Sequence, residues 1–265
     1  MSEAPASYSV QAAVASDVGR VRLSNEDSLA FVCPDDPGLR QRLGVLAIVA
    51  DGMGGHRGGE VASALAVETI CRDYFATPPG DDCLQALELA MLAANKAICR
   101  AGEADCALEG MGTTATVLVV VADEVLLAHV GDSRLYRCSN GQCAQLTEDH
   151  TLVEQMLRDG MISAEDARRH PMRNMLMRSL GTPTGLRVAT RRCPPASVGD
   201  VFVLCSDGLH ESFEATEIAA IVASMEPAAA SRRLVELACE RDGSDNVSVV
   251  VVGIAPAAAA DEAAS

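Results

Sequence analysis

The chain has 265 residues, of which 49% are apolar and only 3% aromatic, and its charges sum to −16. This length suits one domain with a large core, which aliphatic side chains must build. The negative charge repels a nucleic-acid duplex or an anionic membrane at long range, so we expect neither as a partner.

The sequence favours a soluble cytoplasmic protein. Its first residues lack a basic start and an apolar stretch, and no apolar run approaches the ~20 residues that a membrane span needs. The ten cysteines are scattered without a CxxC pair, and the two closest in sequence are Cys138 and Cys143. We therefore expect most cysteines to be reduced.

Short runs of apolar and β-branched residues predict strands, in chain order, over residues 8–14, 29–33, 45–50, 114–121, 125–130, 135–138, 201–205 and 247–252. Apolar residues that recur every three or four positions predict helices over residues 59–75, 83–101, 152–158, 215–224 and 229–241. Strands come in clusters separated by paired helices, which favours antiparallel sheets over a regular βαβ alternation. The expected fold is α+β: an αββα four-layer sandwich with two antiparallel sheets flanked by helices.

We expect a single domain over residues 8–253, with flexible termini at 1–7 and 254–265. One segment breaks the pattern of apolar strands and helices. It covers about residues 147–185, is polar and rich in methionine, and ends in Gly-Thr-Pro-Thr-Gly. This composition indicates an excursion over the surface, which we interpret as a lid.

Acidic residues recur at the ends of the predicted strands. They are Asp51, Asp132 and Asp207 after strands, Asp245 before one, and Glu26 with Asp27 just ahead of another. A strand-ending turn explains any one of these alone, because Asp-Gly and Asp-Asn are turn dipeptides. Together they could converge on one end of a sandwich, where only cations would offset the like charge. Oxygen ligands of this kind suit Mg²⁺ or Mn²⁺ rather than Zn²⁺.

Two neighbouring features have both a functional and a structural interpretation. The loop over residues 52–60 is rich in glycine but lacks GxGxxG, because position 57 is arginine. Its glycines suit a close backbone approach to a metal or phosphate, with the Gly52 carbonyl as a candidate ligand, or else a flexible helix entry. Arg22, five residues before Asp27, could bind a phosphate in a bidentate fork or be an ordinary surface arginine.

Six short motifs follow one another along the chain: Arg22-Leu-Ser-Asn-Glu-Asp, Val49-Ala-Asp-Gly-Met-Gly-Gly-His, Gly112-Thr-Thr-Ala, Val130-Gly-Asp-Ser-Arg, Cys205-Ser-Asp-Gly-Leu and Asp245-Asn-Val-Ser. This series resembles the motifs of the type-2C, metal-dependent serine/threonine protein phosphatases, over about residues 8–253. The Asp-Gly-Met-Gly-Gly-His form resembles the bacterial branch of that family, which opposes serine/threonine kinases.

The resemblance implies hydrolysis of phosphoserine and phosphothreonine on proteins by a metal-activated water at a dinuclear Mn²⁺ or Mg²⁺ centre. The implied metal ligands are Glu26, Asp27, Asp51, Gly52, Asp132, Asp207 and Asp245. Asp51 would bridge both ions, Asp207 and Asp245 would hold the first, and the Gly52 carbonyl the second.

The remaining implied roles are less direct. Glu26 and Asp27 would act chiefly through metal-bound waters. The resemblance thus implies that Asp27 and Asp51 are the catalytic residues. Asp132 and Asp207 would together hold a third, weaker ion. Arg22 would grip the phosphate.

Several side chains near these motifs have open roles. Animal members of the family carry a histidine where this chain has Met53, so the identity of any leaving-group acid is open, and His56 and His170 are weak candidates. His170 lies in the lid, where residues of bacterial members influence substrate choice. The lid methionines Met172, Met175 and Met177 could contact substrate or fill gaps.

Four further side chains receive structural interpretations. We expect His129 to be a hydrogen-bonded core residue, and Glu148, Asp149 and His150 to cap the following helix.

The implied partners are phosphorylated proteins and a cognate serine/threonine kinase, with the chain itself a monomer. The competing hypothesis is a catalytically inactive phosphoprotein-binding module that uses Arg22 and the same pocket. Degenerate members of such folds usually lose metal ligands, and none is lost here. The complete acidic set therefore favours an active enzyme.

Overall fold

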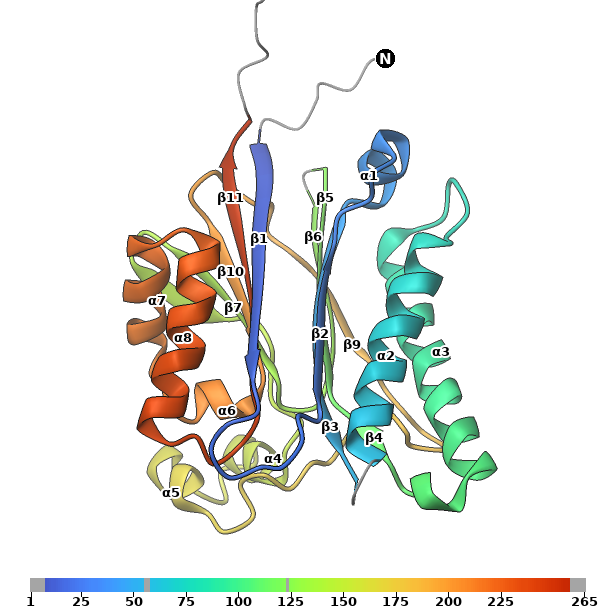
Figure 1. The fold of residues 1–265 in the computed structure, drawn as a ribbon, viewed down its shortest axis with the longest axis vertical. Coiled ribbons are helices and arrows are strands. Elements are labelled where there is room, and N and C mark those ends of the chain that lie inside the picture. The colour runs from blue at the N-terminus through green and yellow to red at the C-terminus, as the bar shows by residue number, and fades with distance from the viewer. Residues whose placement is uncertain (1–7, 55–57, 123, 258–265) are drawn as a thin grey trace, which may run out of the picture.

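The computed structural model describes residues 8–54, 58–122 and 124–257. They form two antiparallel sheets that face one another, with helices on both outer sides (Figure 1). The αββα sandwich predicted from the order of elements is confirmed. None of the described helices is long and apolar enough to cross a membrane.

The first sheet has the strand order β1-β11-β10-β7-β8. Its strands are β1 (Tyr8–Asp17), β7 (Arg134–Ser139), β8 (Gln142–Gln145), β10 (Val201–Cys205) and β11 (Val247–Pro256). The second sheet has the order β2-β3-β5-β6-β9, with β4 paired to β3. Its strands are β2 (Asp27–Val32), β3 (Val45–Met53), β4 (Gly112–Thr113), β5 (Ala115–Val121), β6 (Glu124–Val130) and β9 (Ala189–Cys193).

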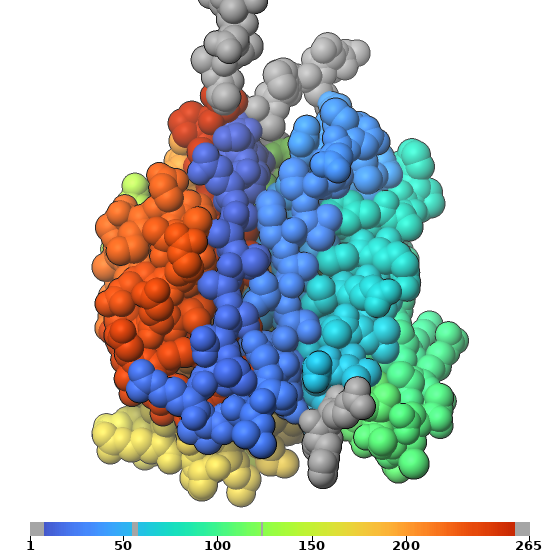
Figure 2. Space-filling model, in the orientation of Figure 1, coloured from blue at the N-terminus to red at the C-terminus, as the bar shows by residue number. Residues whose placement is uncertain are grey.

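Two pairs of helices cover the outer faces of the sheets (Figure 1, Figure 2). The second sheet is covered by α2 (Gly58–Phe75) and α3 (Cys83–Ala104), and the first by α7 (Ala215–Ser224) and α8 (Pro227–Arg241). The shorter helices are α1 (Pro37–Leu43), η1 (Cys106–Leu108), α4 (Leu152–Arg158), α5 (Ala164–Arg169) and α6 (Asp207–His210).

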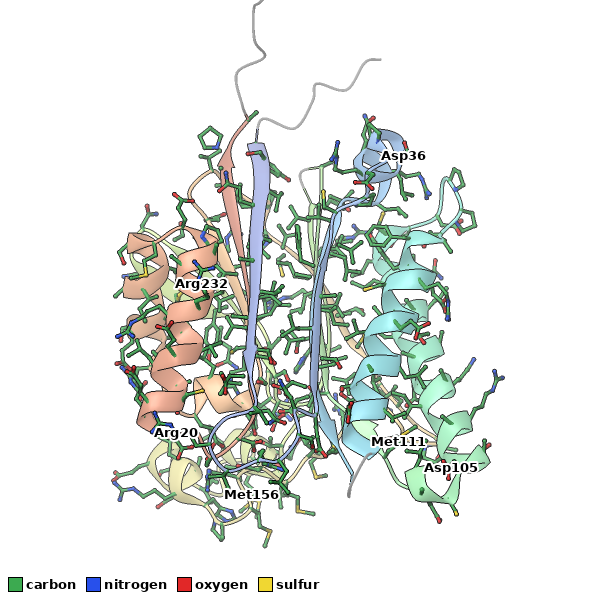
Figure 3. All side chains as sticks on the ribbon, in the orientation of Figure 1. Arg20, Asp36, Asp105, Met111, Met156 and Arg232 are labelled. Carbon is green, nitrogen blue, oxygen red and sulfur yellow. A yellow bond between two sulfur atoms is a disulfide. The ribbon has the colours of Figure 1, made fainter. Side chains whose placement is uncertain are left out.

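Aliphatic side chains fill the space between the sheets (Figure 3). Val49, Leu118, Phe202 and Val250 are almost completely buried there. Central strands such as β5 are buried on both faces, because a helical layer covers the side that does not face the other sheet. This explains why the strands appear in the sequence as continuous apolar runs rather than alternating ones.

The structure corrects the expectation about the C-terminal end and confirms the one about the cysteines. Strand β11 continues to Pro256, so residues 254–256 are not flexible: Ile254 is buried and pairs with Val10. Residues 1–7 and 258–265 lie outside the described part. A disulfide joins Cys138 and Cys143 across the β7–β8 hairpin, whereas the other eight cysteines are free, as predicted for most of them.

Residues 147–185 leave the sandwich after β8, form α4 and α5 at its lower end, and return to β9 (Figure 1). The segment is fastened at its far end by Asn95 of α3. The Asn95 side chain accepts hydrogen bonds from Gly181 N (2.8 Å) and Thr182 N (3.1 Å) and donates one to Thr182 O (2.9 Å). This buried amide therefore anchors the lid to the helical layer.

Replacing this anchor should destabilise the protein. Asn95→Ala leaves two partly buried N–H groups and one carbonyl without their partner, so we expect the free energy of unfolding to fall by about 2 kcal/mol. Asn95→Asp keeps the acceptor and should lose less. Urea denaturation measures both variants, and an unchanged midpoint for Asn95→Ala would contradict the assignment.

Candidate functional site

The antiparallel order brings the predicted acidic residues to one end of the sandwich. Strands β3, β6 and β10 end there, whereas β2 and β11 begin there. In the second sheet, Asp27 stands directly opposite Asp51. The charges of Asp27, Asp132, Asp207 and Asp245 all raise the pKa of Asp51, which shows how closely the five carboxylates gather.

Hydroxyl groups of neighbouring strands hold the two central aspartates in place. Thr114 Oγ1 accepts a hydrogen bond from Asp51 N (2.9 Å), and Thr113 Oγ1 donates one to Asp51 O (2.8 Å). Ser206, which precedes Asp207, donates from Oγ to Asp27 Oδ2 (2.8 Å). That last contact crosses between the sheets, so it fixes the position of one sheet's acidic end against the other's.

The side chain of Asn246 organises the loop between β1 and β2 (residues 18–26). Its Nδ2 donates to Val18 O and Ser24 O, both at 3.0 Å, and its Oδ1 accepts from Glu26 N at 2.8 Å. The adjacent Asp245 forms an ion pair with Arg22 at 2.6 Å. Arg22 and Glu26 are thereby held beside the carboxylates.

The glycine loop after Asp51 has a structural requirement that the sequence left open. A Cβ at Gly52 would overlap the backbone carbonyl oxygens of Gly59 and Glu26, and a Cβ at Gly59 would lie 2.7 Å from Glu26 Oε2. Only glycine allows the start of α2 to lie this close to the end of β3. Residues 55–57, with the candidate His56, lie outside the described residues.

Restricted access to water is the largest cause of the raised carboxylate pKa values, and repulsion between the carboxylates adds to it. Together, burial and repulsion raise the pKa of Asp207 to about 8, that of Asp132 to about 7 and that of Asp27 to about 6. The pKa of Asp51 is raised well above its usual range. Such a cluster retains protons unless cations compensate its charge.

The donor set fits divalent metal ions that prefer oxygen. Asp27 Oδ1 and Asp207 Oδ1 are buried and have no hydrogen-bond partner among the described residues, so both oxygens are available as ligands. No three acidic, histidine or cysteine side chains of these residues already stand at the spacing of a coordinated ion.

Asp132 lies at the side of the cluster that faces the lid. Its backbone oxygen accepts from His210 Nε2 (3.0 Å), and its side chain borders a cavity of about 750 Å³ between α4, α5 and α7. The cavity is separate from the cluster's centre, because Asp27, Asp51, Asp207 and Asp245 do not line it.

The first residues of the lid form an ion pair and hydrogen bonds with the loop that carries Asp132. Arg134 and Asp149 form an ion pair at 2.7 Å. Gly131 N donates to His150 Nδ1 (3.1 Å), while His150 N donates to Gly131 O (2.8 Å). The expectation that Glu148, Asp149 and His150 cap α4 is therefore wrong, because Thr151 is the N-cap and accepts from Glu154 N.

The structure also places the histidines His129 and His170 and the methionine Met53. His129 is a buried core residue, as predicted, whose ring bonds Thr116 Oγ1 (2.9 Å) and Glu148 O (3.1 Å). Its burial lowers its pKa to about 3. His170 follows α5 as its C-cap residue, and its Nδ1 accepts a hydrogen bond from Met172 N within the lid. Met53 belongs to β3 and pairs with Gly112 of β4.

Sequence reasoning missed the polar residues that position the acidic ones. Asn246 was visible only as part of a turn dipeptide, and nothing in the sequence pairs Arg134 with Asp149. Ser206 gave a weak signal, since a serine before Asp-Gly is also compatible with a plain turn. Their partners lie in other strands, so only the assembled fold reveals them.

The fold and its acidic end agree with the family that the six motifs resemble. The chain matches the Protein phosphatase 2C family over residues 21–239. It therefore belongs to the protein phosphatase 2C family.

Two bacterial relatives illustrate the similarity. The serine/threonine protein phosphatase PstP of Mycobacterium tuberculosis is 40% identical over 243 residues, which cover 91% of this chain but 44% of that relative. This chain thus spans less than half the length of PstP. The serine/threonine phosphatase stp of Listeria monocytogenes is 37% identical over 241 residues, which cover 89% of this chain and 92% of stp.

Solved structures give the same result. The crystal structure of the M. tuberculosis phosphatase PstP/Ppp has a TM-score of 0.81 at 38% identity and covers 93% of this chain and 99% of its own. A structure of the catalytic domain of PstP in complex with two manganese ions has a TM-score of 0.78 at 36% identity, covering 93% of this chain and 98% of its own.

The acidic cluster should make the metal-free protein sensitive to pH. The pKa values of Asp132 and Asp207 are raised, to about 7 and about 8, above those of an unfolded chain, so the folded state binds more protons between about pH 4 and about pH 8. Stability in EDTA should therefore fall as the pH rises through this window. Urea denaturation at several pH values measures it.

Asp207→Asn should flatten this pH dependence, because it removes the carboxylate with the higher pKa of the two. Asp81→Asn, at an exposed position in the turn before α3, is the matched control and should leave it unchanged. Added Mn²⁺ should also oppose the loss of stability, since the ion binds only the folded state. Equal stability in EDTA at both ends of the window would contradict the clustering.

Proposed function

We propose that this protein is a protein serine/threonine phosphatase that depends on Mn²⁺ or Mg²⁺ and hydrolyses phosphoserine and phosphothreonine on proteins. The observation that carries the proposal is the convergence of Asp27, Asp51, Asp132, Asp207 and Asp245 at one end of the sandwich. Unpartnered buried oxygens on two of them support metal binding. Family membership and the manganese complex of a related catalytic domain support the reaction.

The chain offers ligands from both sheets. We propose that Asp51 bridges two ions, that Asp207 and Asp245 hold the first, and that the Gly52 carbonyl holds the second. Glu26 would act on these ions chiefly through water molecules that they bind. When bound, such ions activate water as a nucleophile and neutralise the charge of a phosphoryl group.

Two further residues are proposed at the edge of this set. A weaker ion would use Asp132 together with Asp207, whose charges repel one another in its absence. Asp27 is held at Oδ2 by Ser206, whereas its Oδ1 has no partner among the described residues. That oxygen is the acceptor available to orient a water molecule, which is the catalytic role proposed for Asp27.

Arg22 is proposed to bind the phosphoryl group. One of its terminal nitrogens is bonded to Asp245 Oδ2, and about half of its side chain is exposed to solvent. A guanidinium has five N–H donors in a planar fork, so several stay free for phosphate oxygens. The ion pair with Asp245 thus aims Arg22 at the site while leaving it able to bind.

The substrates and setting follow from this proposal. Phosphoproteins made by a cognate serine/threonine kinase are the proposed substrates, and the protein is proposed to act as a cytoplasmic monomer. The proposed role of His170 is substrate selection, since it lies in the lid between α5 and the exposed methionines.

Phosphate release from a phosphothreonine peptide tests the proposal. We expect release with Mn²⁺, none with EDTA, and at least about a hundredfold loss of kcat in Asp51→Asn or Asp207→Asn, because either change removes a ligand of the metal site. Circular dichroism should show both variants folded, since less repulsion remains in the cluster.

Asp81→Asn is the control for the loss of one acidic group and should retain full activity. If the wild-type protein binds the phosphopeptide with Mn²⁺ but releases no phosphate, the proposal is wrong. The protein would then be the catalytically inactive phosphoprotein-binding module.

Arg22→Ala should weaken phosphate binding more than turnover. We expect KM to rise about tenfold, the effect of losing one charge-assisted contact, with a smaller fall in kcat. Arg232→Ala, an exposed arginine on α8 (Figure 3), is the matched control and should change neither constant. A large loss of kcat at unchanged KM would contradict phosphate binding by Arg22.

A further inference from the structure

Most of the large apolar side chains that the described residues expose lie in two segments at the acidic end. Of the ten large exposed apolar residues of the described chain, two lie in the loop between β1 and β2 and four in the lid. We use five of these six and call them the apolar rim: Val21, Leu23, Met172, Met175 and Met177. The lid methionines therefore do not fill gaps in the core, since each of the three is at least 50% exposed.

One part of the apolar rim flanks Arg22. The Arg22 side chain points to Asp245, and the side chains on either side of it are left in solvent, with Val21 68% and Leu23 fully exposed. Asn246 holds the same loop through Ser24 O. Both apolar side chains are thus fixed one residue away from the proposed phosphate ligand.

The other part is tied to the opposite member of the acidic cluster. Met177 N donates to His150 O (2.8 Å), and Met175 O accepts from Leu152 N (2.9 Å). His150 is in turn bonded to Gly131, the residue before Asp132. The loop and the lid both lie at the lower end of the molecule (Figure 2). Arg20 of the loop and Met156 of α4 are labelled there in Figure 3.

Resting on the proposed function, we propose that the apolar rim binds large apolar side chains on either side of the phosphorylated residue, so that the enzyme prefers phosphosites with such flanks. A phosphoprotein that places its phosphate beside Arg22 must lay the neighbouring residues over Val21, Leu23 and the lid. Exposed apolar clusters of this kind mark binding surfaces, and methionine adapts to varied partners. The net charge of −16 also disfavours acidic flanks.

The preference is measured with two phosphothreonine peptides that differ only in having leucine or alanine on both sides of the phosphorylated residue. We expect kcat/KM with Mn²⁺ to be at least about tenfold higher for the leucine peptide, the effect of burying one large side chain. Equal values for the two peptides would overturn the proposal.

Variants locate the preference on the rim. Leu23→Ser combined with Met177→Ser should reduce the ratio between the two peptides to about one. Leu89→Ser, at a position on α3 about as exposed as Met177 and away from the acidic end, is the matched control and should keep the wild-type ratio. A ratio that survives the double substitution would overturn the assignment to the apolar rim.

The readouts separate this inference from the proposed function. p-Nitrophenyl phosphate has no flanking residues, so its hydrolysis with Mn²⁺ tests the chemistry alone. If neither it nor the peptides are hydrolysed, the proposed function fails, and the Kd values of the two peptides for the wild-type protein still test the rim.

Analytical ultracentrifugation tests whether a second copy of this chain, rather than a phosphopeptide, covers the apolar rim. If the wild-type protein is a dimer and the double variant a monomer, the rim is an interface between two copies, and the proposal is overturned.

Discussion

The carboxylate of Asp51 lies where the charges of four other aspartates raise its pKa, because each of them repels the ionised form of Asp51. Repulsion of this kind persists only when the surrounding structure fixes each group independently. Here the fixing elements are continuous apolar strands, buried on both faces, whose packing does not depend on the acidic end. The core between and outside the sheets thus stabilises a cluster that would otherwise disperse.

Polar contacts at the acidic end determine how the two sheets meet. Ser206 bonds Asp27 across the sandwich, and Asn246 of the first sheet fastens the loop that leads into β2 of the second. Each of these side chains is adjacent in sequence to an acidic residue, Asp207 or Asp245. The same short segments therefore supply both a charge and the bond that positions a neighbouring charge.

The sequence predicted the helices with a clear apolar periodicity and the strands that are buried on both faces. The ranges of α4 and α7 agree with the predicted 152–158 and 215–224, and the apolar strands were found because both faces are buried. Edge strands β8 and β9 were missed, since Gln142–Gln145 and Ala189–Cys193 are polar and mostly exposed. Likewise, strand-end aspartates are visible as a pattern, whereas the bond between Arg134 and Asp149 depends on tertiary placement alone.

The division of the acidic residues between the two sheets has a consequence for the chain as it is made. Asp27, Asp51 and Asp132 belong to the second sheet, but Asp245 precedes β11, the last described strand, which inserts between β1 and β10. A nascent chain without β11 cannot assemble the site, however well its earlier segments fold. The proposed phosphatase activity would then appear only with the finished sandwich, so an incomplete chain would not act on phosphoproteins.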